Sequence, residues 1–126
     1  MIEVVKEFTF DAAHKLPNHP GKCRQIHGHT YRLQVGFKGP VNFETGMVVD
    51  FADIKKVIRK SIVDKLDHVL LNEISYDLFP NHTPTAENMV EWMVQVIQSA
   101  STPDAAKLSF IRLYETPTSY AEWRNE

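Results

Sequence analysis

Alternating apolar and polar positions at both ends of the chain predict strands, and two stretches of helical periodicity lie between them. Residues 2–10 are rich in β-branched and aromatic side chains, which are typical of a strand. Residues 28–38 predict a second strand, because apolar and aromatic side chains recur there at every second position. Residues 108–115 predict a third strand, and residues 120–124 a short fourth one.

Two helices are predicted between the second and third strands. Asp50 is a typical N-cap for the first helix, in which apolar residues recur at helical spacing over residues 51–66. The second helix is expected over about residues 85–100, and Thr-Pro-Asp at 102–104 is expected to end it. Its buried side is expected to contain Met89, Val90, Met93, Val94 and Ile97.

This order of elements, β-β-α-α-β-β, predicts an α+β fold in which two helices cover one face of an antiparallel four-stranded sheet. Proteins usually pair or cover the free edges of such a sheet, so we expect the chain to associate with copies of itself through the sheet. At 126 residues, the chain is expected to form a single domain, residues 1–126.

Composition argues against several classes of protein. The chain has 14 Lys and Arg, 16 Asp and Glu, and a net charge of −2, with no basic cluster, so no nucleic-acid partner is expected. No apolar run approaches the about 18–20 residues of a membrane span, and the N-terminus has no signal-peptide pattern, so no membrane association is expected. A single cysteine cannot form an internal disulfide, which fits a reducing, cytoplasmic location.

Three histidines near the first two strands are the clearest candidates for chemistry. His27 and His29 share one face of the second strand, and His14 lies upstream in a long loop predicted for residues 11–26. Neutral imidazole suits zinc, and three protein ligands leave a fourth position for water or substrate, as in catalytic zinc sites. The spacing therefore predicts a zinc site. Two further loop histidines lack this support. His19 is interpreted as a surface residue and His82 as a structural residue.

Cys23 lies in the same predicted loop, between Lys22 and Arg24. Nearby positive charge lowers the pKa of a thiol and so raises the fraction of thiolate. The spacing leaves three roles open: a fourth zinc ligand, a nucleophile or a proton acceptor. A lone cysteine is also commonly a small buried apolar residue.

Two acidic positions add further candidates. Asp67 and His68 follow the first helix, and a carboxylate beside an imidazole suits a proton relay. Because adjacent side chains on a regular element diverge, this pair needs a bend in the backbone or a contact from elsewhere. Glu115 ends an apolar strand, where it either marks the solvent-exposed end or anchors an amidine-like group through two parallel N–H donors.

Six motifs in this order resemble the 6-pyruvoyl-tetrahydropterin synthase superfamily, across essentially the whole chain. The motifs are Phe10-Asp-Ala-Ala-His14, Cys23-x3-His27-Gly-His29, Gly46-Met-Val-Val-Asp-Phe51, Leu66-Asp-His68, Pro84-Thr-Ala-Glu-Asn88 and Glu115-Thr116. The gap of three residues between the cysteine and the next histidine is most similar to the 6-carboxy-tetrahydropterin synthases of queuosine (7-deazaguanine) biosynthesis. The pyruvoyl-forming enzymes typically have a longer gap there.

The resemblance implies the tunnelling fold, in which the sheets of three subunits form a barrel and two trimers stack as a homohexamer, with sites between subunits. It implies one Zn²⁺ per subunit on the three histidines, a general base at Cys23, and a proton-transfer set completed by Asp67 and His68. It also implies that Glu115 binds the 2-amino and N3 edge of a pterin. Three further residues are implied to line that pocket: Thr85, Glu87 and Thr116.

The activity implied is that of a zinc-dependent lyase, which converts 7,8-dihydroneopterin triphosphate to 6-carboxy-5,6,7,8-tetrahydropterin, acetaldehyde and triphosphate. Three alternatives remain open. They are a 6-pyruvoyl-tetrahydropterin synthase, which eliminates triphosphate without cleaving the side chain, a zinc-dependent hydrolase, and a non-catalytic pterin-binding module. The cations near enough in sequence to contact the triphosphate are Lys15, Lys22 and Arg24.

Overall fold

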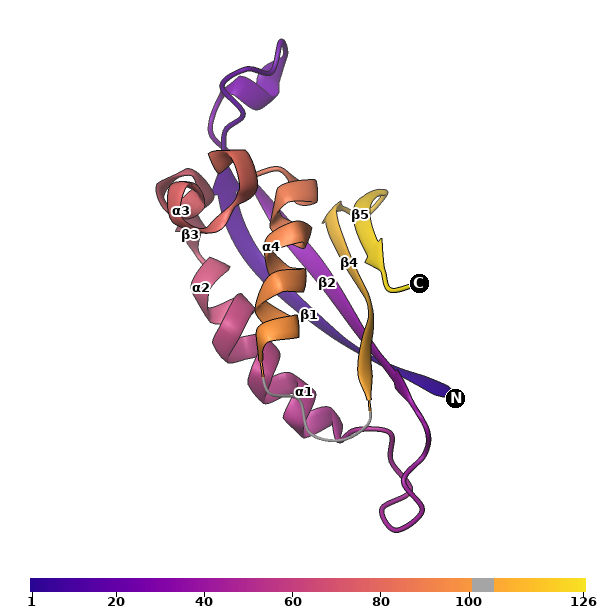
Figure 1. The fold of residues 1–126 in the computed structure, drawn as a ribbon. Helices are drawn as coiled ribbons and strands as arrows, with labels where there is room; N and C mark the ends of the chain where they lie inside the picture. Colours follow the sequence, from indigo (N-terminus) through magenta and orange to yellow (C-terminus); the bar gives the residue numbers. More distant parts are fainter. Residues whose placement is uncertain (101–105) are drawn as a thin grey trace.

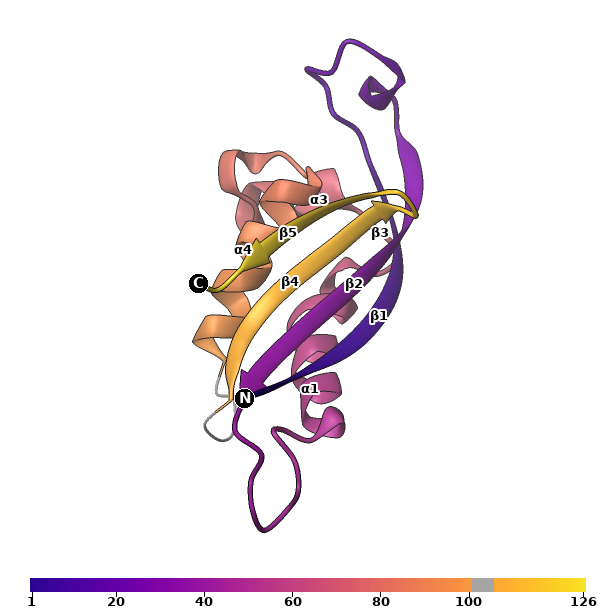
Figure 2. The ribbon, with the colours of Figure 1, turned by 90° about the vertical axis from the view of Figure 1, so that its right-hand side faces the viewer.

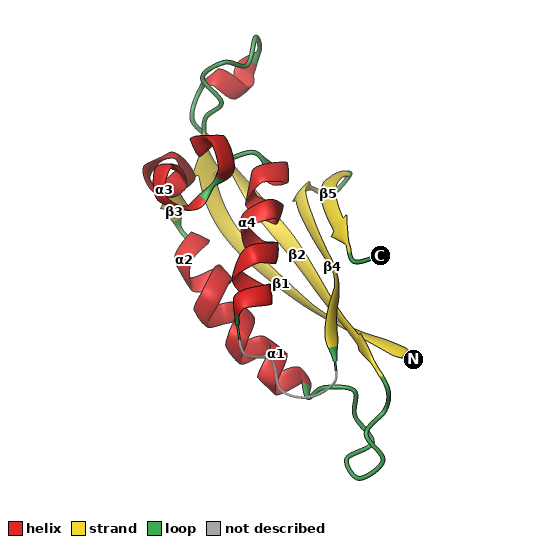
Figure 3. Cartoon of the chain, in the orientation of Figure 1, coloured by secondary structure: helices red, strands yellow, loops and turns green. Residues whose placement is uncertain are grey.

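The computed structural model describes residues 1–100 and 106–126. A twisted five-stranded sheet, in the order β3-β1-β2-β4-β5, carries helices on one face (Figures 1 and 3). Figure 2 looks onto the opposite face, which none of the described helices covers. The predicted α+β class, with helices on one face of the sheet, is confirmed. The second predicted helix ends at Ser99, close to the expected residue 100, and the Thr-Pro-Asp sequence at 102–104 that was expected to end it lies outside the described part of the chain.

The sheet is built from long antiparallel strands with one short parallel addition. β1 (Ile2–His14) pairs with β2 (His27–Gly39), β2 with β4 (Lys107–Thr116), and β4 with β5 (Ser119–Arg124), all antiparallel. β3 (Val69–Leu70) adds a parallel pair at the outer edge of β1. The predicted number of four strands is therefore wrong by this one strand, because two residues are too few to give a periodic signal.

β1 continues beyond its predicted end at Phe10 and reaches His14, which pairs directly with His27 of β2. The loop that was expected to start at residue 11 therefore starts at residue 15. Asp and Ala, which follow Phe10, are weak strand formers, so the local sequence favours an earlier end. Pairing with β2 overrides this preference and extends the strand.

The first predicted helix consists of three consecutive segments: α1 (Phe51–Ile58), a π-helical turn η2 (Arg59–Val63), and α2 (Asp64–Leu66). The Asp50 carboxylate caps it by accepting a hydrogen bond of 2.8 Å from the backbone N–H two residues later, as predicted. Phe51, the first residue of the expected apolar stripe, is half exposed instead. Four stripe residues spaced four apart are buried: Ile54, Ile58, Ile62 and Leu66.

α4 (Ala86–Ser99) is the second predicted helix, and Thr85 caps it by accepting a hydrogen bond of 3.2 Å from the Asn88 N–H. The five residues expected on its inner side are all buried. Three helical segments of the described chain lie where no element was predicted: η1 (Lys22–Arg24), α3 (Leu71–Leu78) and η3 (Pro80–His82). Among the described residues, no helix is long and apolar enough to cross a membrane.

The core lies between the helices and the sheet, and β2 shows how the sequence pattern places it. The odd-numbered side chains from Tyr31 to Phe37 are all buried, as the period of two predicts. His27 and His29 continue the same face at the start of the strand and are half-buried. The predicted strand face therefore joins the core to the histidines.

Gly36 on β2 lies against the ring of Phe110 on β4, where a Cβ would stand 2.3 Å from the ring carbon Cε1. We expect Gly36→Ala to lower the free energy of unfolding by about 1–3 kcal/mol, because the buried ring must move. Gly28→Ala on the same strand is the control, since its nearest neighbour would be the Ala12 carbonyl oxygen at 3.9 Å. Urea unfolding followed by circular dichroism measures both variants, and equal losses would contradict this packing.

Candidate zinc site and adjoining pocket

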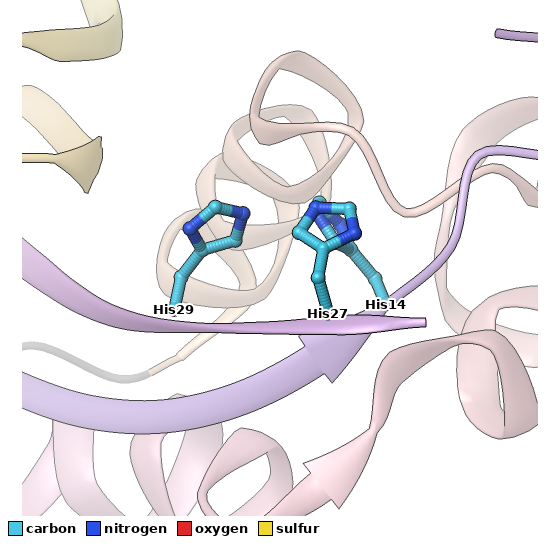
Figure 4. Close-up of side chains that lie close together, drawn as sticks. All are labelled: His14, His27 and His29. Carbon is cyan, nitrogen blue, oxygen red and sulfur yellow. The ribbon is translucent and has the colours of Figure 1, made fainter. Parts of the chain in front are cut away.

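The ladder between β1 and β2 brings the three predicted metal ligands together. His14 and His27 are cross-strand partners, and His29 lies two residues along the same face (Figure 4). Directly opposite side chains in such a ladder are close neighbours. The ring centroids are 4.6 Å apart for His14 and His27, 4.8 Å for His27 and His29, and 5.1 Å for His14 and His29. One nitrogen from each ring lies within 4.8 Å of the other two.

Backbone carbonyl groups fix the orientation of two of these imidazoles. The Nδ1 of His14 donates a hydrogen bond to the carbonyl oxygen of Pro84, and the Nδ1 of His27 donates to that of Gln25, each at 2.8 Å. A carbonyl oxygen can only accept, so Nδ1 carries the proton in both rings. In the neutral rings, each Nε2 therefore has a free lone pair.

The lone pairs of His14 and His27 face each other, with 3.0 Å between the two Nε2 atoms. Two lone pairs repel at this distance unless a cation lies between them. The Nε2 atom of His29 is buried and has no hydrogen-bond partner. The Nε2 lone pairs of His14 and His27, with the unpartnered Nε2 of His29 beside them, fit a zinc ion, for which neutral imidazole is a preferred ligand.

Burial adapts these rings to metal binding. It lowers the pKa of His14 and of His29 below the usual value of 6.5, because little water remains to stabilise an imidazolium. The carboxylate of Glu115 lies 3.4 Å from the Nε2 of His14 and 3.9 Å from that of His29, and it opposes this shift. Burial has the larger effect, so both rings keep their neutral, metal-binding form to lower pH than an exposed histidine does.

Glu115 links the histidines to two hollows of about 410 Å³ each. One lies beside the ends of β2 and β4, where His29 and Thr116 line it together with Glu115. The other lies between the start of α4 and β5, where Glu87 faces the same space as Glu115. Of the other three residues predicted for a pterin pocket, Glu87 and Thr116 each line one of the hollows that Glu115 also lines. Thr85 lines neither hollow and instead caps α4.

Asp67 and His68 form a second, separate group. The Oδ1 atom of Asp67 lies 2.9 Å from the Nδ1 of His68 and accepts a hydrogen bond of 3.0 Å from the Asp11 N–H. That backbone bond is the main reason why the pKa of Asp67 is lowered. The backbone of His68 is left-handed, with φ = 61°, which supplies the bend that this pair was predicted to need.

The Asp11 carboxylate completes this second group, which does not include the three histidines. The Asp11 carbonyl oxygen also accepts a hydrogen bond of 2.6 Å from the His68 N–H. Sequence reasoning missed Asp11 as a site residue, although it lies in the motif of residues 10–14. Its contacts to Asp67 and His68 span more than fifty positions, which no local pattern reports.

Cys23 lies in a short 3-10 turn, η1 (Lys22–Arg24), within the loop of residues 15–26 that projects past the end of the sheet (Figure 1). Its carbonyl oxygen accepts a hydrogen bond of 2.7 Å from the Leu16 N–H, and its side chain is half-buried. Its sulfur is not among the atoms grouped with the histidines. The structure therefore does not group the Cys23 sulfur with the three histidines as a fourth ligand, and the role of Cys23 stays a prediction.

The remaining histidines make other contacts. His19 is exposed, and its Nδ1 accepts a hydrogen bond of 3.0 Å from the Gly21 N–H. His82 stacks on Tyr76, with 4.5 Å between the ring centroids. These contacts agree with their interpretation as a surface residue and a structural residue.

Comparison with known proteins assigns this histidine-containing α+β fold to a family. The family model described as 6-pyruvoyl tetrahydropterin synthase matches residues 3–126, so the chain belongs to this family. It is 36% identical to the 6-carboxy-5,6,7,8-tetrahydropterin synthase of Haemophilus influenzae, over 98% of this chain and 99% of the relative. It is also 36% identical to the protein of that name from Synechocystis, over 95% of this chain and 91% of the relative.

A solved structure shows the same fold. The 6-pyruvoyl tetrahydropterin synthase of Caenorhabditis elegans superposes with a TM-score of 0.84 and 26% identity, covering 99% of this chain and 96% of that one. The tunnelling-fold class implied by the sequence motifs is thus confirmed for this chain.

We expect wild-type protein to retain zinc after dialysis and His14→Ala to lose it. Changing a partner of a metal ligand already lowers affinity about 10–100-fold, and removal of a ligand should lower it further. His19→Ala is the matched control and should retain stoichiometric zinc. Elemental analysis of the dialysed proteins measures this, and equal zinc contents would exclude His14 as a ligand.

The pH dependence of zinc binding should follow the lowered pKa values of His14 and His29. Protons compete with the metal only once the rings become protonated. Zinc affinity should therefore change little from pH 8 to about pH 6.5, the usual histidine pKa, and should fall at lower pH. Competition with a chelator across this range measures it. A steep loss of affinity already above pH 7 would contradict the effect of burial.

Proposed function

We propose that this chain is a zinc-dependent lyase that converts 7,8-dihydroneopterin triphosphate and water to 6-carboxy-5,6,7,8-tetrahydropterin, acetaldehyde and triphosphate, within queuosine biosynthesis. The observation that carries the proposal is the convergence of three histidine Nε2 atoms beside Glu115, at the edge of a pocket. The relatives at 36% identity, which bear the corresponding name, support it.

A bound zinc ion would act as a Lewis acid on oxygens of the substrate side chain, making the neighbouring C–H and O–H groups more acidic. His14, His27 and His29 would hold one such ion per subunit. The carbonyl groups of Pro84 and Gln25 fix the rings of His14 and His27, and burial lowers the pKa of His14 and of His29 and so keeps these two rings neutral. Three protein ligands leave a position for substrate.

Glu115 is the proposed anchor for the pterin ring. The 2-amino group and N3–H of a pterin are parallel donors, and a carboxylate accepts two such bonds at once. The Glu115 carboxylate borders both hollows and lies within 4 Å of two histidines, so anchor and metal ligands belong to one site. Glu87 and Thr116 line the adjoining space, whereas Thr85 is proposed to act by shaping the start of α4.

Proton transfer is assigned to Cys23 and to the pair of Asp67 and His68. Cys23, between two basic residues, would act as a general base in its thiolate form. The Asp67 carboxylate accepts a hydrogen bond from the Nδ1–H of His68, so that Nε2 of the exposed ring remains available for proton exchange. Each such group typically contributes about 10²–10⁴-fold in rate.

The separation of the two groups supports a site built from more than one subunit. His68 is 76% exposed and lies outside the histidine group. Along β1, only Ala12 and Ala13 pair with β3, so in the described chain the outer edge over residues 2–11 has no strand partner. Pairing of this edge with another subunit, as in the implied trimeric barrel and hexamer, would place the Asp67–His68 pair of one chain at the histidines of another.

The alternative is a 6-pyruvoyl-tetrahydropterin synthase, which the similarity to the Caenorhabditis elegans structure favours. It would use the same residues to eliminate triphosphate and would leave the side chain intact. The gap of three residues between Cys23 and His27 favours the carboxy-forming enzyme. A non-catalytic pterin-binding module would have no use for Cys23, Asp67 and His68 together.

Mass spectrometry of the products from zinc-loaded protein and 7,8-dihydroneopterin triphosphate tests the proposal. We expect 6-carboxy-tetrahydropterin with equimolar acetaldehyde and triphosphate. A pyruvoyl product without acetaldehyde would establish the alternative, and unchanged substrate would contradict both. Cys23→Ala should keep zinc and lower turnover by at least about 10²-fold, the low end for a general base.

Complementation tests the shared site. Cys23→Ala and His68→Ala should each be nearly inactive alone. Co-refolded in equal amounts, they should recover up to about one quarter of wild-type activity. A shared site takes Cys23 from one chain and His68 from another, and in a random mixture each of these residues is intact in half of the sites. A mixture of wild-type protein with the Cys23→Ala/His68→Ala double variant, refolded in the same way, gives the reference activity for mixed oligomers. No recovery in oligomers that demonstrably contain both chains would place the two residues in one subunit's site.

A further inference from the structure

His14 is oriented by a segment far away in sequence. Its buried Nδ1 atom donates to the carbonyl oxygen of Pro84, seventy positions later, just before α4. We propose that Asn88 is a positioning residue of the zinc site: it holds residues 83–85 so that the Pro84 carbonyl selects the metal-binding tautomer of His14. The inference rests on the proposed zinc site and assigns a role to the asparagine of the Pro84–Asn88 motif.

Asn88 contacts the residues on both sides of Pro84. Its side-chain Nδ2 donates to the carbonyl oxygen of Thr83 at 2.9 Å, and its backbone N–H donates to the hydroxyl of Thr85 at 3.2 Å. The Thr85 N–H also donates to the Thr83 carbonyl oxygen, at 3.0 Å. Proline has no N–H through which its own position can be fixed. The direction of the Pro84 carbonyl therefore depends on the two residues that Asn88 holds.

The side chain of Asn88 does more than cap the helix. The cap requires only its backbone N–H, which the hydroxyl of Thr85 accepts. In a capping box, the side chain at this third helical position accepts a hydrogen bond from the backbone N–H of the cap residue. Here the side chain instead donates, to a carbonyl oxygen that precedes the helix. The amide group is therefore directed at the segment that carries Pro84.

The Nδ1 atom of His14 has a second neighbour that can hydrogen-bond to it. The Pro84 carbonyl therefore decides which ring nitrogen of His14 carries the proton. The hydroxyl of Tyr31 lies 3.5 Å from the same Nδ1 atom. Tyr31 is fully buried, and a neutral phenol can donate a hydrogen bond. If the Pro84 carbonyl moves away, donation from Tyr31 favours an unprotonated Nδ1. The proton then resides on Nε2, and the lone pair needed for zinc is lost.

Asn88→Asp separates this role from helix capping. Aspartate keeps the size of the side chain and the capping N–H, and its negative charge near a helix N-terminus is favourable. It has no donor for the Thr83 carbonyl. Thr83→Ala is the matched control in the same segment, because it removes a side chain and keeps that carbonyl. If Asn88 only capped the helix through its backbone N–H, Asn88→Asp would change the zinc affinity little.

Two measurements on the isolated protein test the proposal without any pterin. Zinc affinity, from competition with a chromophoric chelator, should fall about tenfold in Asn88→Asp, the low end for a partner of a metal ligand. Thr83→Ala should bind zinc like wild-type protein. In the metal-free protein, ¹⁵N NMR of the histidine rings should show an unprotonated Nε2 for His14 in wild-type and a protonated one in Asn88→Asp.

Tyr31→Phe provides the rescue. Added to Asn88→Asp, it removes the competing donor and should restore the Nδ1-protonated tautomer and part of the zinc affinity. Wild-type affinity in folded Asn88→Asp, or lowered affinity with an unchanged tautomer, would overturn the proposal. Failure of the proposed reaction is distinguishable, because it would appear as missing product while both measurements still give the expected results.

Discussion

The register between β1 and β2 is the constraint on which the rest of the site depends. It sets His14 opposite His27 and keeps His29 on the same face. Because side chains alternate along a strand, a slip of one residue would turn His27 and His29 to the other face of the sheet. The core residues from Tyr31 to Phe37 would turn with them, so the hydrophobic core stabilises the register that the metal site requires.

A second constraint is the direction of the Nε2 lone pairs. Two carbonyl groups from different parts of the chain, at Gln25 and Pro84, take up the Nδ1 protons of two rings. The result is a close contact of 3.0 Å between two Nε2 atoms, which is favourable only with a cation between them. Ordinary backbone carbonyl groups thus select the tautomers that leave both Nε2 lone pairs available to a metal ion.

The residues to which we assign binding and proton transfer form two groups that lie apart in a single chain. The histidines and Glu115 form one group, and Asp67 with His68 forms another at the edge of β1. That edge is unpaired over most of its length in the described chain. In the proposed association of subunits, completion of the site and pairing of the edge would be the same event.

The sequence by itself determined those features that depend on local periodicity. The alternation along β2 predicted the shared face of His27 and His29, and helical spacing with an Asp50 cap predicted the first helix. The sequence did not determine that β1 reaches His14 or that β3 exists. Nor did it determine that Asp11 and Pro84 contact site residues. Those features arise from hydrogen bonds between segments that are separate in the sequence, from 13 positions for His14 and His27 to 70 for His14 and Pro84. Only the tertiary structure decides them, because a local pattern carries no information about which distant backbone group will be within reach.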